Sequence, residues 1–346
     1  MKKKFSILIQ HLLIATFCFL SMASCVEEDS YDNSCKGNFD ALWKIIDEHY
    51  CFLDYKNKEY GLNWDSVYQK YRQHINPNMA SMQLFEVCDK MLRELRDGHV
   101  NLTASHNSAR YWDWFEQYPA NFSDSLQRKY IGIDYNLTQG IKYKTLKNNI
   151  GYIYVPSFDY SYGSGNLSSI FSILSLCNGL IVDVRNNPGG QLTSAQSLAE
   201  CFINKKTIGG YISHKTGRSH SAFSAPKAIE LTPAEGIRWQ KPVVVLTNRN
   251  CYSAANSFVM YMKACSNATI IGDRTGGGCG MPFHSELPNG WSVRFSACPM
   301  YDINMKLTES GIDPDIKIDI TSEDWQKGKD TMIEAAFTHL GAAPLL

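Results

Sequence analysis

The chain has 346 residues, 44% of them hydrophobic, which is enough to bury a substantial core in one large or two small domains. Lysine plus arginine and aspartate plus glutamate each number 34, so the formal net charge at pH 7 is zero. Nucleic-acid binding needs a surplus or a stripe of basic residues, and this balance argues against it. No nucleic-acid partner is therefore expected.

The N-terminus has the composition of an export signal. Lys2–Lys4 supply a positive start, Phe5–Leu20 a mostly apolar stretch, and Ser21–Ser24 a run of small or flexible residues. The apolar stretch is interrupted by polar residues and is too short for a comfortable membrane span. We therefore predict a signal peptide over residues 1–24.

A cysteine follows this signal in a context that resembles a bacterial lipobox. In Met22–Cys25 a methionine replaces the usual leucine, and Cys25 would carry the lipid that anchors the chain to a membrane. Residues 25–37 then form a linker, whose acidic run Val26–Asp29 resembles the surface-export signal of some Bacteroidetes lipoproteins or is merely solvated. We expect an outer-membrane or cell-surface lipoprotein of a Gram-negative bacterium. The alternative is a soluble periplasmic or secreted protein cut before Cys25.

Residues 38–100 show the spacing of amphipathic helices. Two apolar stripes recur at i, i+3 and i+4, which is typical of helices with one buried face. The first comprises Phe39, Leu42, Trp43, Ile46 and Tyr50, and the second Leu84, Val87, Cys88, Met91, Leu92 and Leu95. They predict a small N-terminal helical domain whose apolar faces are core, not a cofactor site.

Residues 101–148 connect this domain to the rest of the chain. They carry an aromatic cluster that is either a lid on the core or part of a substrate cleft, formed by Trp112, Trp114, Phe115 and Tyr118. We interpret the segment as a loop of this kind together with strands.

From residue 130 onward the pattern changes to strands that alternate with helices. Strands are predicted at Tyr130–Tyr135, Ile141–Thr145 and Ile150–Val155, and helices at Leu167–Leu176 and Ser194–Phe202. Such alternation is typical of an α/β protein with a mainly parallel sheet. We assign residues 149–320 to this core and residues 321–346 to a C-terminal helix and tail.

The segment Lys241–Ala264 combines a buried strand, a polar turn and a helix. Val243–Leu246 is an apolar run typical of a strand buried on both faces, and apolar residues recur at helical spacing from Phe258. Ser253 lies in the turn, where the first N–H groups of the helix lack partners. It is either an N-cap or a nucleophile whose oxyanion the amide of Ala254 would bind.

Three further motifs accompany this segment. GLIVDVRNNPGG at Gly179–Gly190 is a buried strand that ends in a turn allowing close approach of a ligand. DGHV stands at Asp97–Val100 and ESGIDPD at Glu309–Asp315. In this order the four motifs resemble the C-terminal processing peptidase and tricorn protease family of serine peptidases. The resemblance covers about Asn38 to Asp319. It implies an α/β core of stacked ββα units, like that of ClpP and the crotonases, after a small helical domain.

The resemblance also implies a set of catalytic residues. Processing members of the family use a lysine as base at a position that corresponds to Gly278, so the Ser/Lys dyad is absent. The tricorn-like branch uses serine, histidine and glutamate instead. These match Ser253 as nucleophile, His99 as general base and then acid, and Glu309 as the carboxylate that orients His99.

The oxyanion hole implied by the family consists of the backbone amides of Gly189 and Ala254. Two positions depart from the family pattern: Gly98 stands where tricorn has a serine, and Asn256 where many relatives have a glutamate. Many relatives also insert a PDZ domain after the helical domain. Residues 101–148 are too few for one, so no PDZ domain is predicted.

Two hypotheses from different classes follow. The first is a serine endopeptidase that hydrolyses peptide bonds of extended or unfolded polypeptides, with a peptide or protein as its substrate. The second is a catalytically inactive peptide- or ligand-binding module on the same fold. The joint presence of Ser253, His99 and Glu309 in their motifs favours the enzyme. It also argues against the acyl-CoA chemistry that crotonases perform on this fold.

Other residues could in principle serve as catalytic or metal-binding groups. His284 could replace His99 as base, but no motif for an orienting acid follows it. Cys251 precedes the helix start, where the helix dipole helps a thiolate less than it would at Ser253. The eleven cysteines include no C-x-x-C spacing, so zinc ligation is unsupported, and no metal or cofactor is implied.

Overall fold

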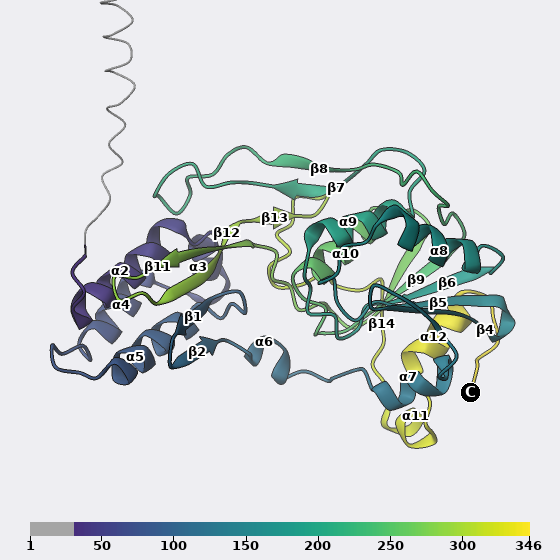
Figure 1. The fold of residues 1–346 in the computed structure, drawn as a ribbon, viewed down its shortest axis with the longest axis horizontal. Helices are drawn as coiled ribbons and strands as arrows, with labels where there is room; N and C mark the ends of the chain where they lie inside the picture. Colours follow the sequence, from purple (N-terminus) through teal and green to yellow (C-terminus); the bar gives the residue numbers. More distant parts are fainter. Residues whose placement is uncertain (1–30) are drawn as a thin grey trace, which may run out of the picture.

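The computed structural model describes residues 31–346 (Figure 1). The predicted signal peptide over residues 1–24 and the predicted lipid-bearing Cys25 lie outside the described residues, so both stay predictions. Over residues 31–346, no helix combines the length and the apolar composition needed to cross a membrane.

Four helices and a four-stranded sheet form the N-terminal lobe of the molecule (Figure 1). The helices are α2 (Cys35–His49), α3 (Leu53–Tyr60), α4 (Trp64–Arg72) and α5 (Ser81–Arg93). The two predicted apolar stripes lie on α2 and α5 and in the residues that directly follow them, and most of their side chains are buried. The expectation of helices with a core-facing stripe is therefore confirmed. Side-chain caps at Ser34 and Asn63 fix the starts of α2 and α4.

The sheet of this lobe combines strands from both halves of the chain. Its antiparallel order is β11-β12-β1-β2. The bounds are β1 (Asn101–Ala104), β2 (Asn107–Arg110), β11 (Met281–Glu286) and β12 (Ser292–Cys298). The β11–β12 hairpin thus reaches from the C-terminal half to pair with β1, the strand that directly follows the DGHV turn. This pairing ties the N-terminal lobe to the rest of the molecule.

A seven-stranded sheet forms the second lobe, which we call the core lobe, in the order β14-β10-β9-β6-β5-β4-β3. The five strands from β14 to β5 are parallel, and β4 and β3 are antiparallel. Every residue of β6 and β9 is buried, as predicted for strands covered on both faces. The bounds are β3 (Asn136–Thr138), β4 (Ile141–Leu146), β5 (Ile150–Tyr154), β6 (Gly179–Asp183), β9 (Val243–Thr247), β10 (Ala268–Gly272) and β14 (Ile316–Lys317).

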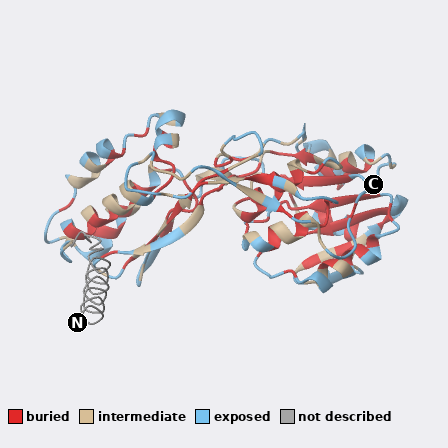
Figure 2. Ribbon diagram, turned by 90° about the horizontal axis from the view of Figure 1, so that it is seen from above, coloured by how far each residue is buried: buried red, intermediate tan, exposed pale blue. Residues whose placement is uncertain are grey.

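Helices cover both faces of the seven-stranded sheet, and Figure 2 shows the buried strands between them. One face packs against α8 (Ser164–Leu174), α9 (Leu192–Glu200) and α10 (Ala254–Lys263). The other packs against α7 (Asp124–Ile131) and α12 (Thr331–His339). This layered arrangement confirms the predicted α/β fold. The remaining elements are α6 (Asp113–Glu116), η1 (Lys147–Asn149), α11 (Ser322–Lys327), β7 (Thr207–Ile212), β8 (Lys227–Leu231) and β13 (Met300–Tyr301).

The connecting segment 101–148 contributes to both lobes. Its strands β1 and β2 belong to the N-terminal lobe, while α7, β3 and β4 belong to the core lobe. In the described part of the chain this segment therefore builds no inserted domain of its own.

One predicted strand is wrong. Tyr130–Tyr135 was expected to be extended, but Tyr130 and Ile131 form the last turn of α7. Ser123 caps the start of this helix, and Gly132, with a φ of 68°, ends it. Both residues of the last turn are buried against the sheet. An apolar run this short fits a helix face as well as a strand, so periodicity could not separate the two.

A buried ion-pair network holds the end of β6. Nε and Nη2 of Arg185 donate to the Asp183 carboxylate at 2.9 and 2.7 Å, and Nη1 donates to both oxygens of Asp330 at 3.0 and 2.9 Å. All three side chains are fully buried. Because β6 leads directly into the turn Asn186–Gly190, this network fixes the base of that turn.

Candidate active site

Ser253 lies between β9 and α10 in a backbone conformation that is rare for a residue with a side chain. Its φ is 57° and its ψ is −121°. It occupies the N-cap position of α10, but its hydroxyl makes no capping hydrogen bond. Of the two roles that the sequence left open, the helix cap is therefore not observed. Such local strain persists only where the surroundings impose it, typically at functional sites.

His99 lies in the turn between α5 and β1, and the Asp97 carboxylate holds it there. Asp97 accepts the backbone N–H of His99 at 2.7 Å. It also accepts hydrogen bonds from three hydroxyl groups, those of Tyr50 at 2.9 Å, Ser296 at 3.0 Å and Tyr252 at 3.3 Å. These donors come from the end of α2, from β12 and from the turn before α10. The buried carboxylate thus fixes the histidine relative to both lobes.

The imidazole of His99 meets the hydroxyl of Ser253 between the two lobes. Nε2 of His99 lies 3.0 Å from Oγ of Ser253, which is hydrogen-bond distance. Burial lowers the pKa of His99 to about 4, and the Asp97 carboxylate opposes this effect. His99 is therefore neutral at pH 7 and able to accept the serine proton. The structure brings together the predicted nucleophile and base.

The alternative catalytic groups occupy other environments. His284 lies on β11, an outer strand of the N-terminal lobe sheet, and is not bonded to Ser253. Cys251 is buried, its Sγ donates to the carbonyl of Val184 at 3.0 Å, and burial raises the pKa of its thiol. At Gly278, a Cβ atom would lie 2.4 Å from the ring of Tyr252, so a lysine there would require that ring to move.

Glu309 is buried close to Asp97, but its partners differ from the predicted one. One carboxylate oxygen accepts from Nζ of Lys56 at 3.3 Å and the other from the amide of Cys279 at 3.1 Å. Burial and the Asp97 charge raise the pKa of Glu309 to about 8. Nδ1 of His99 is buried and has no hydrogen-bond partner in the described chain. Glu309 thus makes no direct hydrogen bond to His99, and its orienting role stays a prediction.

Gly98 and Glu309 both line a cavity of about 380 Å³ beside the DGHV turn. A Cβ atom on Gly98 would lie 2.5 Å from Nε1 of Trp114 and 2.9 Å from the hydroxyl oxygen of Tyr252. Trp114 stacks on Tyr252 with 4.1 Å between ring centroids. Of the aromatic cluster, Trp114 thus packs over the DGHV turn. Trp114 takes the space that a serine side chain at position 98 would need.

The two amides predicted for the oxyanion hole differ in whether they already donate a hydrogen bond. The amide of Ala254, in the first turn of α10, donates to no residue of the described chain. The amide of Gly189 donates to Oδ1 of Asn187 at 2.9 Å. Gly189 has a φ of 106°, and a Cβ atom on it would lie 2.7 Å from Cβ of Ser253. The glycine turn approaches the serine closely, and the assignment of both amides stays a prediction.

Sequence reasoning missed several residues of the site. Lys56 reaches Glu309 across 253 positions of chain, and no sequence pattern signals such a pair. The contact of Asn187 with Gly189 could have been predicted from the sequence, since the side chain of an asparagine in a turn commonly hydrogen-bonds the backbone two residues on. Tyr252 and Asp97 stand next to or within quoted motifs, but their burial and mutual contact follow only from the fold.

Other polar groups near the site serve the structure. Asn256, at the position where many relatives have glutamate, is buried and accepts from the hydroxyl of Thr275 at 2.7 Å. The nine cysteines from Cys35 to Cys298 are free thiols. No group of three or more histidine, cysteine, aspartate or glutamate side chains within residues 31–346 is arranged to hold a metal ion.

Comparison with known proteins identifies the family of the chain. The description of Peptidase family S41 matches residues 149–318, and that of the Tricorn protease C1 domain matches residues 31–93. The chain belongs to peptidase family S41. The structure is similar to that of a peptidase candidate from Parabacteroides merdae, with a TM-score of 0.85 and 47% identity, covering 90% of this chain and 98% of that one.

Two relatives match this S41 chain over part of its length. The Tricorn protease of Thermoplasma acidophilum is 26% identical over 248 residues, which are 71% of this chain and 20% of the relative. The carboxy-terminal processing protease CtpA of Bacillus subtilis is 28% identical over 175 residues, 50% of this chain and 36% of the relative. The chain thus spans only a fifth to about a third of the length of these relatives.

Proposed function

We propose that this S41 family member is a serine peptidase that hydrolyses peptide bonds of extended or unfolded polypeptides. The observation that carries the proposal is the 3.0 Å contact between Oγ of Ser253 and Nε2 of His99, at a serine with a strained backbone. A serine hydroxyl is a weak nucleophile at neutral pH, and a neutral histidine within hydrogen-bond reach activates it. Family membership supports the same chemistry.

In the proposed reaction, Oγ of Ser253 attacks the carbonyl carbon of the scissile bond while Nε2 of His99 takes the hydroxyl proton. The carbonyl oxygen becomes an oxyanion, which the amides of Ala254 and Gly189 would bind. In characterised enzymes one such donor lowers the barrier by about 3 kcal/mol. His99 then gives its proton to the leaving amine, and water activated by the same histidine hydrolyses the acyl-enzyme.

The Gly189 donor requires a change at the glycine turn. Its N–H now donates to Oδ1 of Asn187 and would have to be shared with, or released toward, the oxyanion. Gly189 and Gly190 have φ values of 106° and 132°. Glycine moves through such conformations at little cost, so the turn can readjust when substrate binds.

We further propose that Glu309 stabilises the imidazolium of His99. A positive charge on a histidine favours the ionised form of a nearby carboxyl group. Protonation of His99 would therefore draw Glu309, whose pKa is about 8, toward its anion. The ammonium group of Lys56, 3.3 Å from Glu309, would offset part of the repulsion between the negative charges of Glu309 and Asp97. Because no direct hydrogen bond joins Glu309 to His99, this role rests on charge and on the electrostatic interaction of both groups with Asp97.

The preference for extended substrates rests on the sheet beside His99. Strands β2 and β11 are the outer strands of the four-stranded sheet. An outer strand carries unpaired backbone groups that an extended peptide can join as an additional strand. His99 lies two residues before β1, the neighbour of β2. A segment of unfolded chain would fit this edge, whereas a folded domain would not offer one.

Labelling with a fluorophosphonate serine probe tests the proposal on the chain that begins after Cys25. We expect wild type to be labelled, and Ser253→Ala and His99→Ala to lose labelling, because one removes the nucleophile and the other its base. His74→Ala is the matched control, since His74 is exposed and follows α4, outside the residues of the site. It should label like wild type.

The same experiment separates the peptidase from its alternative. Circular dichroism verifies that each variant is folded. A folded wild-type protein that takes up no probe and cleaves no unfolded protein would contradict the proposal and favour an inactive binding module.

A further inference from the structure

A row of polar side chains crosses the whole N-terminal lobe sheet next to His99. In the strand registers His284 lies opposite Arg294, Arg294 opposite Asn101, and Asn101 opposite Arg110. Directly opposed residues of antiparallel strands project to the same face of the sheet. The four side chains therefore share one face, and two of them carry a permanent positive charge.

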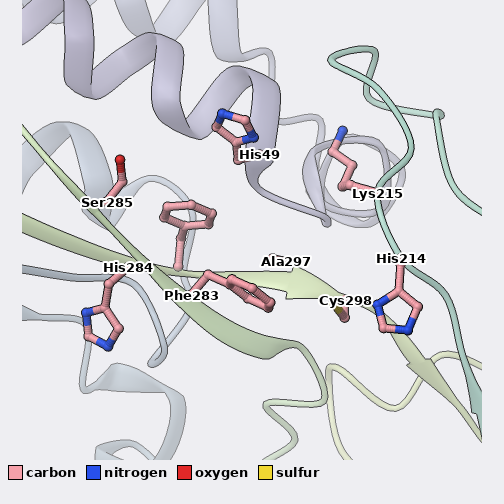
Figure 3. Close-up of a pocket in the computed structure, with 9 residues that line it drawn as sticks. His49, His214, Lys215, Phe283, His284, Ser285, Ala297 and Cys298 are labelled. Carbon is pink, nitrogen blue, oxygen red and sulfur yellow. Dashed lines mark hydrogen bonds between the residues drawn. The ribbon is translucent and has the colours of Figure 1, made fainter. Parts of the chain in front are cut away.

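Two hydrogen bonds show that this face contacts the DGHV turn. Nδ2 of Asn101 donates to the carbonyl of Gly98 at 3.2 Å, and Nε of Arg110 donates to the same oxygen at 2.6 Å. Figure 3 shows His284 pointing away from His49 and Ser285, which lie on the other side of the β11–β12 hairpin. His284 is the one member of the row that also lines the cavity drawn there.

The two arginines of the row have no carboxylate partner in the described chain. Arg294 is half-buried and makes neither a hydrogen bond nor an ion pair with any residue between 31 and 346. Burial and the charge of Arg110 lower the pKa of Arg294. Arg110 has only its bond to Gly98 and a contact of 4.3 Å with the ring of Trp112. Two like charges, one on either side of Asn101, are thus left without an ion-pair partner in the described chain.

Asp97 is the acid whose charge acts on Arg294, and its carboxylate already has a full set of hydrogen-bond donors. The carboxylate of Asp97 is buried and accepts hydrogen bonds from the backbone of His99 and from three hydroxyl groups. It is therefore not available to pair with Arg294. Guanidinium groups bind carboxylates in a planar, two-pronged geometry, so a half-buried arginine without a partner is suited to an incoming anion.

The row lies where the leaving part of the substrate would pass. The histidine of a serine peptidase hands its proton to the leaving amine, so the segment after the scissile bond runs beside that histidine. Both arginines act electrostatically on His99. We propose that Arg110 and Arg294 bind a carboxylate on the leaving-group side of the substrate, either an acidic side chain or a free C-terminus. This inference rests on the proposed peptidase function.

Cleavage mapping followed by matched peptides tests the inference. Wild-type cleavage sites are first mapped by mass spectrometry in an unfolded protein such as casein. Around one mapped site, peptides are then made with an acidic residue or its uncharged amide on the leaving-group side, each with a free or an amidated C-terminus. We expect the carboxylate-bearing peptides to have a kcat/KM at least about tenfold higher, as charge-assisted hydrogen bonds suggest.

The arginine variants connect this preference to the row. In Arg294→Gln the ratio of kcat/KM between acidic and amide peptides should fall toward one, and in Arg294→Glu a lysine peptide should become preferred. Arg294→Lys should keep part of the ratio, because the charge stays but the planar fork is lost. Arg238→Gln is the control, since Arg238 is an exposed arginine outside the row. It should keep the wild-type ratio.

The peptide set also identifies the source of the carboxylate. An effect of the free C-terminus alone would assign the site to chain ends, and an effect of the acidic residue alone to side chains. Equal kcat/KM for all four peptides, or a ratio that Arg294→Gln leaves unchanged, would overturn the inference while the peptidase function stands. If wild type cleaves nothing, the proposed function fails and the inference falls with it.

Discussion

Nε2 of His99 lies 3.0 Å from Oγ of Ser253, although 154 positions separate the two residues and they belong to different lobes. His99 is fixed by the N-terminal lobe through Asp97, and Ser253 by the junction of β9 and α10 in the core lobe. The candidate site is therefore an interface between lobes. Its geometry depends on the β11–β12 hairpin, which originates after Ser253 in the chain and pairs with the strand after His99.

The pH dependence of activity should reflect the burial of His99. Its pKa is lowered to about 4, so the neutral base persists at pH values where an ordinary histidine, with a pKa of about 6.5, is protonated. We expect kcat/KM to rise with pH around a midpoint near 4. An acid limb centred near 6.5 would contradict the assignment of His99 or its burial.

The same shift predicts a change in stability. Because the pKa of His99 is lower in the folded than in the unfolded chain, the unfolded state binds more protons between pH 6.5 and 4. The free energy of unfolding should therefore decrease as pH falls through this window. Urea unfolding at several pH values, compared between wild type and His99→Gln, isolates this contribution.

Gly189→Ala should inactivate the protein. A methyl group there would lie 2.7 Å from Cβ of Ser253 and 2.9 Å from the amide of Ala254, and the φ of 106° is unfavourable for alanine. We expect kcat to fall by about a hundredfold or more, as after loss of an oxyanion donor. Gly165→Ala is the matched control, because a Cβ on Gly165 meets nothing within 4 Å. Activity in Gly189→Ala close to wild type would refute the proposed oxyanion site.

Glu309→Gln should lower kcat by about a hundredfold or more, since it removes the charge proposed to stabilise the imidazolium. The variant also leaves Lys56 buried without its ion pair, which costs stability. The double variant Lys56→Met/Glu309→Gln should regain stability but not activity, which separates the two roles. Asp313→Asn, an exposed acid of the same motif, should behave like wild type. A fully active double variant would remove Glu309 from the mechanism.

Cys25→Ser should abolish lipid attachment if residues 1–24 are a lipoprotein signal. Cells fed an alkyne-tagged fatty acid should label the wild-type chain, and the variant should be unlabelled and leave the membrane fraction. Cys18→Ser, within the predicted signal, is the control and should remain labelled. Wild-type protein that is exported without label would support the soluble alternative.

The sequence predicted those features that depend on local pattern. Apolar spacing located α2, α5, β6 and β9, because a buried face imposes its period on the residues that form it. Motif resemblance located Ser253 and His99. The strand prediction for Tyr130–Tyr135 failed because a run of a few apolar residues is too short to show whether its period is that of a helix or of a strand.

What the sequence could not predict depends on register and long-range contact. The row from His284 to Arg110 exists only because three strand pairings align four residues from distant segments. The partner of Glu309 is equally hidden, since Lys56 lies on a helix whose face toward the site is set by packing. The hydrogen bond from the amide of Gly189 to Asn187 depends on the orientation of a single side chain, that of Asn187.

Asp330→Ala should be among the most destabilising single substitutions in the core lobe. Asp330 accepts two hydrogen bonds from Nη1 of Arg185, caps α12 and is fully buried. Its removal leaves a buried guanidinium with Asp183 as its remaining ion-pair partner, and breaking such pairs costs about 3–5 kcal/mol. Chemical denaturation should show this loss, while Glu323→Ala, which removes an exposed acid of α11, should change the midpoint little. If the Asp330 variant unfolds at the wild-type midpoint, the network does not stabilise the core lobe.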